Sequence, residues 1–291
     1  VPQSSPTGAA ETIAKVKPVI DGPTAATRYC PEEKIVAPPT VIVYDNSGSM
    51  AYPLNMPDSE LEAMNERYHR QKTAYEQQAQ VQAGMNQLAR MFGGKAGSTG
   101  PAPAFPAKTR WVAANYPSKL REYGPQRMDV AIPLVQRLID EIPPEIPLGL
   151  VAFSDCDKIS GKFSGADGTG RAGLTRLIAG LSPDGATPIA ASLNRAGSML
   201  DGTSEANPGL IILITDGVEH CEGDPCAVAR AIKQAKPWLA AHVVKLGPES
   251  SSTCVAQAMD GQVFQPRTLD QLAESINAAR ITAPFELGCR Q

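Results

Sequence analysis

The stretch Val41–Met50, VIVYDNSGSM, decides the fold of this chain. Four strand-forming residues run straight into a tight loop that carries one carboxylate, Asp45, and two hydroxyls, Ser47 and Ser49. Hard divalent cations such as Mg²⁺ prefer oxygen ligands, so an acid followed by two serines at alternate positions suits a cation site built on a loop. The same residue types also form Asx turns and helix caps, and this stretch alone does not decide between the two interpretations.

Two later segments supply matching groups. Residues 184–189 read DGATPI, and residues 210–217 read LIILITDG, a second apolar strand followed by an acid. Together with the first loop they form the pattern Asp-x-Ser-x-Ser, then Thr, then Thr-Asp-Gly, which resembles the metal-ion-dependent adhesion site of the von Willebrand factor A (VWA) domain. The resemblance covers roughly residues 40–280, apart from one long insertion. All five positions of the site match: Asp45, Ser47, Ser49, Thr187 and Asp216.

The resemblance implies a role for each of these side chains. Ser47, Ser49 and Thr187 would be inner ligands of a divalent cation, while Asp45 and Asp216 would supply negative charge directly or through water. One coordination position would remain for a carboxylate of a partner protein. Two carboxylates balance the dication only in part, which keeps the cation electrophilic. Mg²⁺ is expected, with Mn²⁺ or Ca²⁺ as alternatives, because oxygen ligands argue against zinc and copper.

From Thr40 onward, strand patterns alternate with helix patterns, which indicates a mostly parallel sheet covered on both faces. The resemblance implies a doubly wound, six-stranded α/β sheet of Rossmann-like VWA type, in the order 3-2-1-4-5-6. Ligands of such sheets bind beyond the carboxyl ends of the strands, where Asp45 and Asp216 would lie at adjacent strand tips about 5 Å apart. We expect strands at residues 40–45, 147–153, 158–163, 209–215, 241–246 and 262–265.

Helices are expected between these strands. Pro188 and Pro225 suit the first turns of two of them, and Thr268 with Gln271 suits a capping box. Thr187 stands directly before Pro188, so it is also a candidate N-cap, a role that competes with metal binding. We expect helices at residues 126–141, 188–200, 225–236 and 268–280.

Residues 51–125 form an insertion, because they separate the first loop from the first domain helix, where the family usually has a short connection. Residues 58–92 predict one helix of roughly 50 Å, at about 1.5 Å per residue. Residues 93–125 are rich in Gly and Pro and predict an ordered loop that packs back on the domain. An insertion folded over the strand tips would make access to the metal conditional.

The apolar residues of the long helix form two narrow stripes. A narrow stripe suits packing against one surface, either that of a partner or the flank of the domain itself. On the first interpretation, the partner-binding residues are Leu61, Met64, Tyr68, Tyr75, Met85, Leu88 and Phe92.

The six cysteines stand in no zinc-finger spacing, which favours disulfides and an oxidising, extracytoplasmic compartment. Cys30 and Cys289 flank the domain and are expected to join its ends. A zinc site that includes Cys221 and Cys226 is disfavoured by their CxxxxC spacing. For the other four cysteines two sets of pairs stay open: Cys221–Cys226 with Cys156–Cys254, or Cys156–Cys221 with Cys226–Cys254.

The chain divides into an extended Pro/Ser/Thr-rich arm (1–39), the VWA domain (40–285) with its insertion (51–125), and a tail (286–291) tied by Cys289. The net charge is −3 and no basic cluster occurs, which argues against a nucleic-acid partner. No apolar run reaches the length of a membrane span. The first residue is Val, and we expect that a signal peptide or an anchor has been removed.

These observations predict a bacterial, extracytoplasmic module, in the periplasm or secreted, in which a bound cation captures an acidic side chain of another cell-envelope protein. The alternative is a structural subunit of an envelope complex, docked through the insertion without metal. A Mg²⁺-dependent hydrolase is disfavoured, since phosphatases of the haloacid dehalogenase type resemble Asp-x-Asp-x-Thr and Ser47 stands at the second Asp. No serine lies in a Gly-x-Ser-x-Gly elbow, and no catalytic residue is expected.

Overall fold

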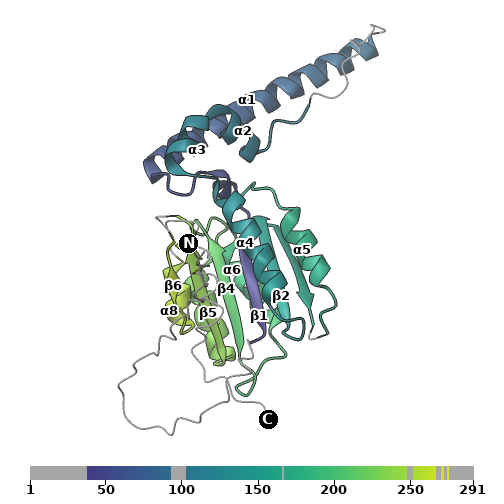
Figure 1. Cartoon of the computed structure of the whole chain (residues 1–291). Coiled ribbons are helices and arrows are strands. Elements are labelled where there is room, and N and C mark those ends of the chain that lie inside the picture. The colour runs from purple at the N-terminus through teal and green to yellow at the C-terminus, as the bar shows by residue number, and fades with distance from the viewer. Residues whose placement is uncertain are drawn as a thin grey trace, which may run out of the picture. The chain divides into compact units, whose positions relative to one another are not determined.

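A six-stranded sheet forms the centre of the molecule (Figure 1). The computed structural model describes residues 38–92, 103–165, 167–247 and 252–266, together with 270, 271 and 274. The strand order is β3-β2-β1-β4-β5-β6, with β3 antiparallel to β2 and every other pair parallel. This confirms the predicted sheet. The strands are β1 (Thr40–Asp45), β2 (Leu148–Asp155), β3 (Lys158–Ser164), β4 (Gly209–Thr215), β5 (Leu239–Lys245) and β6 (Val263–Phe264).

The central strand β1 positions the predicted site. Its Tyr44 pairs with Ala152 of β2 on one side and with Ile214 of β4 on the other. All residues of β1 are buried, as expected for a strand that is covered on both faces. Because β1 and β4 run parallel, their carboxyl ends meet at one edge of the sheet, and Asp45 comes next to the residues that follow β4.

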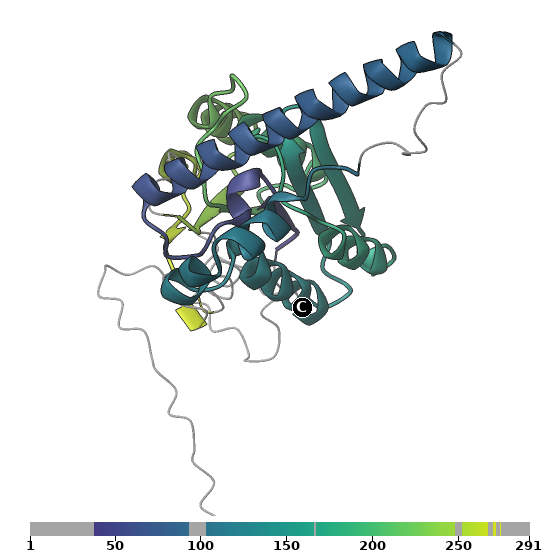
Figure 2. The ribbon, with the colours of Figure 1, turned by 90° about the horizontal axis from the view of Figure 1, so that it is seen from above.

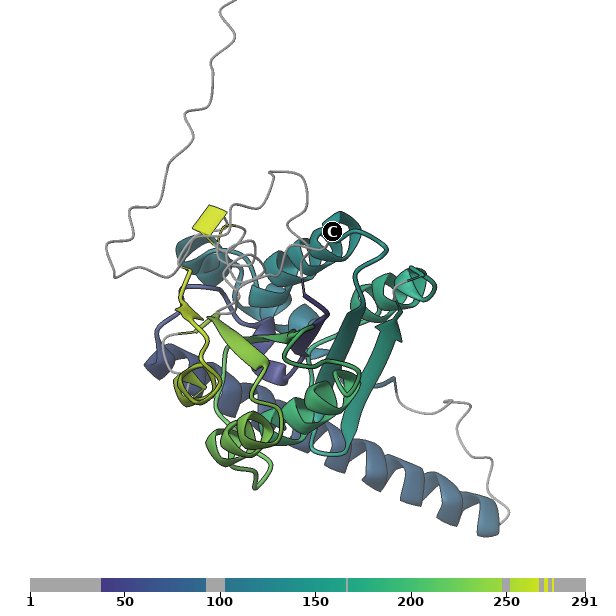
Figure 3. The ribbon, with the colours of Figure 1, turned by 90° about the horizontal axis from the view of Figure 1, so that it is seen from below.

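Helices cover both faces of the sheet (Figure 3). The helices α4 (Arg127–Glu141) and α5 (Arg171–Ala179) pack with Ile42 and Tyr44 of β1. On the other face, Val41 and Val43 pack with a second set of helices, as the two-residue period of a strand requires. These are α6 (Ile189–Met199), α7 (Pro225–Ala235) and α8 (Thr253–Ala258).

Three of the expected helices, α4, α6 and α7, begin and end within one residue of their predicted bounds. The expected helix 268–280 and its capping box lie largely outside the described residues. The helices α5 and α8 were not predicted from the sequence. Each is short, and α5 shows only Leu174 and Ile178 as buried apolar positions, which is too little periodicity to detect.

A 3₁₀ turn, η1 (Gly48–Ala51), leads into the insertion, which begins with the 34-residue helix α1 (Asp58–Met91). The prediction of a loop over residues 93–125 was wrong, because the described part of this segment forms two helices, α2 (Lys108–Asn115) and α3 (Pro117–Tyr123). Pro117 occupies the first position of α3, and Gly124, with φ of +92°, follows its last residue. Pro and Gly here mark the ends of short helices, which is their common role at helix termini.

The first turns of α1 pack against α2 and α3, and the rest of α1 continues beyond them (Figure 2). A small aromatic core joins these helices, in which the rings of Tyr68 and Trp111 lie 5.2 Å apart, edge to face. Trp111 Nε1 donates a hydrogen bond to Gln71 Oε1 of α1 at 2.8 Å. Met64 and Tyr68 are only 2% and 3% exposed, so their prediction as partner-binding residues was wrong. The insertion needs them for its own core.

Two disulfides decide between the pairings that the sequence left open. Cys156 is bonded to Cys221, and Cys226 is bonded to Cys254. The first bridge joins the turn after β2 to the loop after β4, and the second joins the first turns of α7 and α8. The predicted Cys30–Cys289 bridge lies outside the described residues, as do the tail and residues 1–37 of the N-terminal arm. No helix in the described part of the chain is both long and apolar enough to cross a membrane.

Candidate metal centre

Asp45, at the end of β1, is fully buried and accepts hydrogen bonds on both carboxylate oxygens. The backbone N–H of Ser47 donates to Asp45 Oδ1 at 2.8 Å, which turns the loop back toward the strand end. Thr215 Oγ1, at the end of β4, donates to Asp45 Oδ2 at 2.6 Å. The sheet edge and the loop therefore hold this carboxylate in one orientation.

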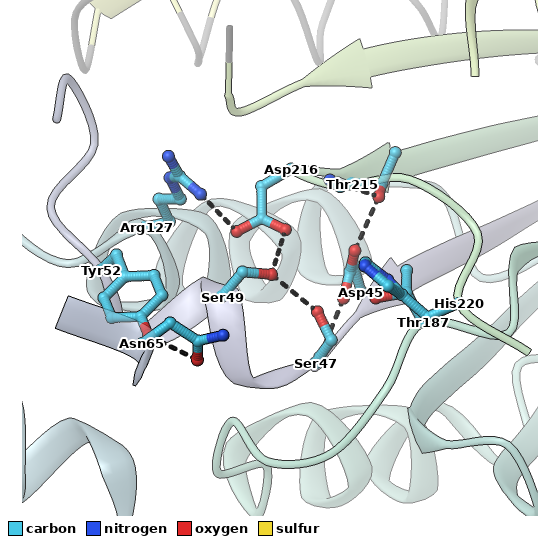
Figure 4. Close-up of polar contacts among 11 residues, drawn as sticks. Asp45, Ser47, Ser49, Tyr52, Asn65, Arg127, Thr187, Thr215, Asp216 and His220 are labelled. Atoms are coloured by element: carbon cyan, nitrogen blue, oxygen red, sulfur yellow. Dashed lines mark hydrogen bonds and ion pairs between the residues drawn. The ribbon is translucent and has the colours of Figure 1, made fainter. Parts of the chain in front are cut away.

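A chain of oxygen atoms runs from the loop after β1 to the end of β4 (Figure 4). Ser47 Oγ lies 3.0 Å from Ser49 Oγ, and Ser49 Oγ donates to Asp216 Oδ1 at 2.8 Å. Residues that are far apart in the sequence thus place their oxygen atoms side by side. Hard divalent cations bind such groups of carboxylate and hydroxyl oxygens.

Thr187 completes the predicted set from the segment before α6. A Cβ atom at Gly217 would lie 3.8 Å from Thr187 Oγ1 and 3.9 Å from Ser49 Oγ, so both hydroxyls border the same small space. Thr187 Oγ1 also lies 3.2 Å from Nδ1 of His220 (Figure 4). The sequence did not connect His220 with Thr187, because the contact joins two loops that follow different elements.

Thr187 does not cap α6, the role that the sequence offered as the alternative to metal binding. The helix α6 begins at Ile189, and no side chain at its N-cap position forms a capping hydrogen bond. Instead, Glu219 Oε2 accepts a hydrogen bond from the backbone N–H of Ala190 at 2.7 Å. Glu219, from the loop after β4, thus accepts the hydrogen bond of a free backbone N–H in the first turn of α6. The Thr187 hydroxyl lies with the oxygen atoms of the site.

The two carboxylates of the site influence one another. Burial first, and then the negative charge of Asp216, raise the pKa of Asp45 to about 7, against the lowering effect of the hydrogen bonds from Ser47 and Thr215. Burial and a like charge both disfavour the ionised form of a carboxyl group. A divalent cation between the carboxylates would relieve this repulsion, so the charges and the donor atoms both fit the predicted cation.

Arg127, the first residue of α4, is a further site residue that the sequence did not reveal. Its Nη1 donates to Asp216 Oδ2 at 2.8 Å, and the two side chains are only 2% and 0% exposed. Asp216 therefore binds Arg127 through one oxygen and Ser49 through the other. The sequence did contain a signal for this role. A positive charge in the first turn of a helix is unfavourable next to the helix dipole, so Arg127 needs a negatively charged partner there.

Residues 118–219 match the family model of the von Willebrand factor type A domain. The chain contains a VWA domain. The matched span includes Thr187 and Asp216, whereas the loop with Asp45, Ser47 and Ser49 lies before it, on the other side of the long helix α1. A comparison with curated proteins finds no match.

Several solved structures are similar to this chain. One is a von Willebrand factor type A protein from Catenulispora acidiphila, 18% identical over 84% of this chain and 42% of its own, with a TM-score of 0.50. The PilB minor pilin from Streptococcus sanguinis is 12% identical, covering 86% of this chain and 62% of its own (TM-score 0.48). The proximal thread matrix protein 1 from the mussel byssus, with a zinc-occupied MIDAS motif, is 16% identical over 60% and 43% (TM-score 0.43). The chain thus spans less than two thirds of each.

The insertion forms one wall of a cleft at the candidate metal centre. The cleft has a volume of about 640 Å³ and contains Ser47, Ser49, Thr187 and Asp216 among its lining residues. The wall from the insertion, which lies opposite these residues, includes Asn65 and Lys108. Burial lowers the pKa of Lys108 to about 8, while the charge of Asp184 acts in the other direction. The insertion thus lies over the strand tips.

The other predicted partner-binding residues lie elsewhere on α1. Leu61 is half-buried beside the aromatic core of the insertion. Tyr75 contacts Phe105 and donates a hydrogen bond to the carbonyl of Pro103. Three residues are well exposed near the C-terminal end of α1, with exposed fractions of 64% (Met85), 54% (Leu88) and 85% (Phe92). A partner contact at these residues stays a prediction.

Proposed function

We propose that this VWA domain binds another protein through a divalent cation, held by Asp45, Ser47, Ser49, Thr187 and Asp216. The observation that carries the proposal is the continuous chain of oxygen atoms from Ser47 through Ser49 to Asp216. In the described part of the chain no group of three or more His, Cys, Asp or Glu residues gathers, so hydroxyls are essential to this donor set. A set of two carboxylates and several hydroxyls suits Mg²⁺ first, and Mn²⁺ or Ca²⁺ next.

The charges of the site favour an acidic partner. When bound, the cation supplies a Lewis-acidic position that attracts a carboxylate oxygen. Arg127 already neutralises part of the charge on Asp216, and the hydroxyls add none. The site with its cation therefore carries a net positive charge, which an Asp or Glu side chain of the partner would balance.

We also propose an extracytoplasmic location, with a partner in the cell envelope. The four described cysteines, Cys156, Cys221, Cys226 and Cys254, all form disulfides. Disulfides of this kind form and persist in oxidising compartments. As these thiols are oxidised, they offer no ligands to a zinc ion.

Binding without catalysis is the proposed activity. Ser47 stands where a phosphatase of the haloacid dehalogenase type would need an acid. The contact of His220 with Thr187 places an imidazole beside a hydroxyl, and this is the strongest argument for an enzyme. A turnover assay with generic phosphate and ester substrates decides the question, and we expect no turnover from the wild type.

Metal binding can be tested directly by calorimetric titration with Mg²⁺ and Mn²⁺. Replacing Ser49 with Ala removes the hydroxyl between Ser47 and Asp216, and we expect affinity for both cations to fall by at least tenfold. Ser198→Ala, at an exposed position on α6, is the matched control and should bind as the wild type does. Equal affinity in the two variants would contradict the proposed site.

The partner can then be sought in an envelope extract. Proteins retained in Mg²⁺, released by chelator and absent with Ser49→Ala would support metal-dependent capture.

A second candidate function is docking through the insertion without metal. It is favoured by the exposed apolar residues near the end of α1, which include Met85, Leu88 and Phe92. Binding that survives both chelation and Asp45→Ala, but is lost when Met85 and Phe92 are replaced with Ser, would establish this alternative in place of metal-dependent capture.

A further inference from the structure

We propose that Lys108 forms a second anion-binding position beside the loop of Ser47, Gly48 and Ser49, here called the metal loop, so that the cleft takes a protein segment with two neighbouring carboxylates. This inference rests on the proposed function, because the first carboxylate would bind the cation. The second would bind the ammonium group of Lys108. The insertion thereby contributes directly to the choice of ligand.

Lys108 comes from the first turn of α2, yet its ammonium lies against the metal loop. A Cβ atom at Gly48 would lie only 2.6 Å from Lys108 Nζ. Gly48 stands between the two serines of the site, so the absence of a side chain at this position gives the ammonium its place. The positive charge is thus adjacent to Ser47 and Ser49 and lines the same cleft.

The surrounding side chains hold Lys108 in this position. Its Nζ donates to Asn65 Oδ1 at 3.0 Å, and Tyr52 donates to the same oxygen at 2.9 Å. The ammonium also lies 4.9 Å from the ring centroid of Tyr68 and 5.4 Å from that of Tyr52. Aromatic faces attract cations in this geometry, and because Tyr68 is part of the insertion core, the position is rigidly supported.

Lys108 retains hydrogen-bonding capacity that a ligand could use. A lysine ammonium has three donors, and in the described part of the chain its one hydrogen-bond acceptor is Asn65. The residue is 5% exposed, and no carboxylate among the described residues lies within ion-pair distance of it. Arg127 on the same cleft is paired with Asp216. A buried cation without a counter-ion is costly, and an incoming carboxylate would reduce that cost.

The charge of the whole cleft also favours a ligand with two negative charges. Among the lining residues, four acids (Glu62, Asp155, Asp184 and Asp216) balance four bases (Lys72, Lys108, Arg127 and Lys158). A bound dication would add two positive charges, and Asp45 beneath it removes one. The loaded cleft then has an excess of positive charge, and its volume of about 640 Å³ is ample for a peptide segment.

Two small acids test the proposal on the Mg²⁺-loaded protein. Glutarate carries two carboxylates, whereas pentanoate has the same length of carbon chain and one carboxylate. We expect glutarate to bind about tenfold more tightly in an NMR titration, because one added charge-assisted hydrogen bond has this effect. Lys108→Met should remove the preference, while pentanoate still binds in a Mg²⁺-dependent manner.

Lys162→Met is the matched control, since Lys162 is exposed on β3 and does not line the cleft. It should keep the preference for glutarate. A preference that survives Lys108→Met, or that is absent from the wild type, would overturn the proposal.

The side-chain NMR signal of Lys108 gives a readout that needs no substitution. Its ¹⁵Nζ signal should shift with glutarate and stay in place with pentanoate. A signal that does not shift with glutarate overturns the inference, even if Lys108→Met fails to fold.

The failure of the proposed function and the failure of this inference give different results. If pentanoate binding needs no Mg²⁺ and is unchanged in Ser49→Ala, the proposed function is wrong. If pentanoate binding requires the metal but glutarate gains nothing, only the role of Lys108 is wrong.

Discussion

The two walls of the cleft are built in different ways. The wall at the strand ends includes Ser47, Ser49 and Asp216, which follow buried strands, and Asp45 is fully buried at the end of the central strand β1. The wall from the insertion carries Lys108, and a small aromatic core around Tyr68 and Trp111 supports it. The first wall shares the large core of the domain, while the second has only a minor core of its own.

This difference predicts how the stability of each wall responds to substitutions. A change at the strand ends should alter charge and metal binding in a frame that stays folded, because most of the sheet core is untouched. A change in the core of the insertion should release Lys108 and its neighbours while the sheet persists. Local stability follows the amount of apolar surface that supports each region.

The largest effect is expected at the boundary of the two walls. Replacing Arg127 with Ala leaves the buried Asp216 carboxylate without its ion-pair partner. For the metal-free protein we therefore expect the free energy of unfolding to fall by about 3–5 kcal/mol. Urea denaturation measures this loss. Arg137→Ala, which breaks an exposed ion pair with Glu141 on the same helix, should cost less than about 1 kcal/mol. Similar losses for the two variants would mean that the Arg127–Asp216 pair has no special role.

Removing the aromatic support of the insertion comes next. Trp111→Ala deletes the ring that packs on Tyr68, and we expect a cost of about 3 kcal/mol, confined to the insertion. Hydrogen exchange should accelerate in α1, α2 and α3 and stay slow in β1 and β4. Equal acceleration in the sheet would show that the two walls are not independent.

The pH dependence of the metal-free protein tests the wall at the strand ends. The folded-state pKa of Asp45, about 7, lies above its ordinary value of 3.8, so the folded protein binds this proton more tightly than the unfolded chain. The resulting stabilisation is complete below about pH 4 and is lost as the pH rises through 7, with a size on the order of 4 kcal/mol.

Thermal unfolding of the wild type and of Asp45→Asn between pH 4 and 8 measures this contribution as the difference between the two curves. Mg²⁺ should offset the loss at high pH in the wild type only. A difference that does not change with pH would contradict the raised pKa of Asp45.

The smallest effect on stability is expected at the exposed end of α1. Replacing Phe92, which is 85% exposed, with Ser should change the free energy of unfolding by less than about 0.5 kcal/mol. The same substitution in Met64, which is buried in the insertion core, should cost at least 2 kcal/mol. Denaturation of the two variants side by side gives the contrast, and a large cost at Phe92 would mean that another part of the chain covers it.

The sequence by itself determined the sheet and the position of the site. Continuous apolar runs such as that in β4 are local patterns, and the strand bounds predicted from the sequence agree with the structure within two residues. The resemblance to the VWA family supplied the strand order and the five oxygen donors, because the spacing of the motif is a property of the linear chain. Asp45 and Asp216 then had to meet at the edge where parallel strands end.

Only the tertiary structure decided which charges accompany those donors. The pairing of Arg127 with Asp216, the contact of Lys108 with the metal loop and the choice of disulfide partners all join segments that lie far apart in the chain. The two stripes of α1 looked alike in the sequence, yet Met64 and Tyr68 of one are buried, whereas Met85, Leu88 and Phe92 of the other are exposed. A periodic pattern shows which face of an element is apolar, whereas the packing of distant elements determines what covers that face.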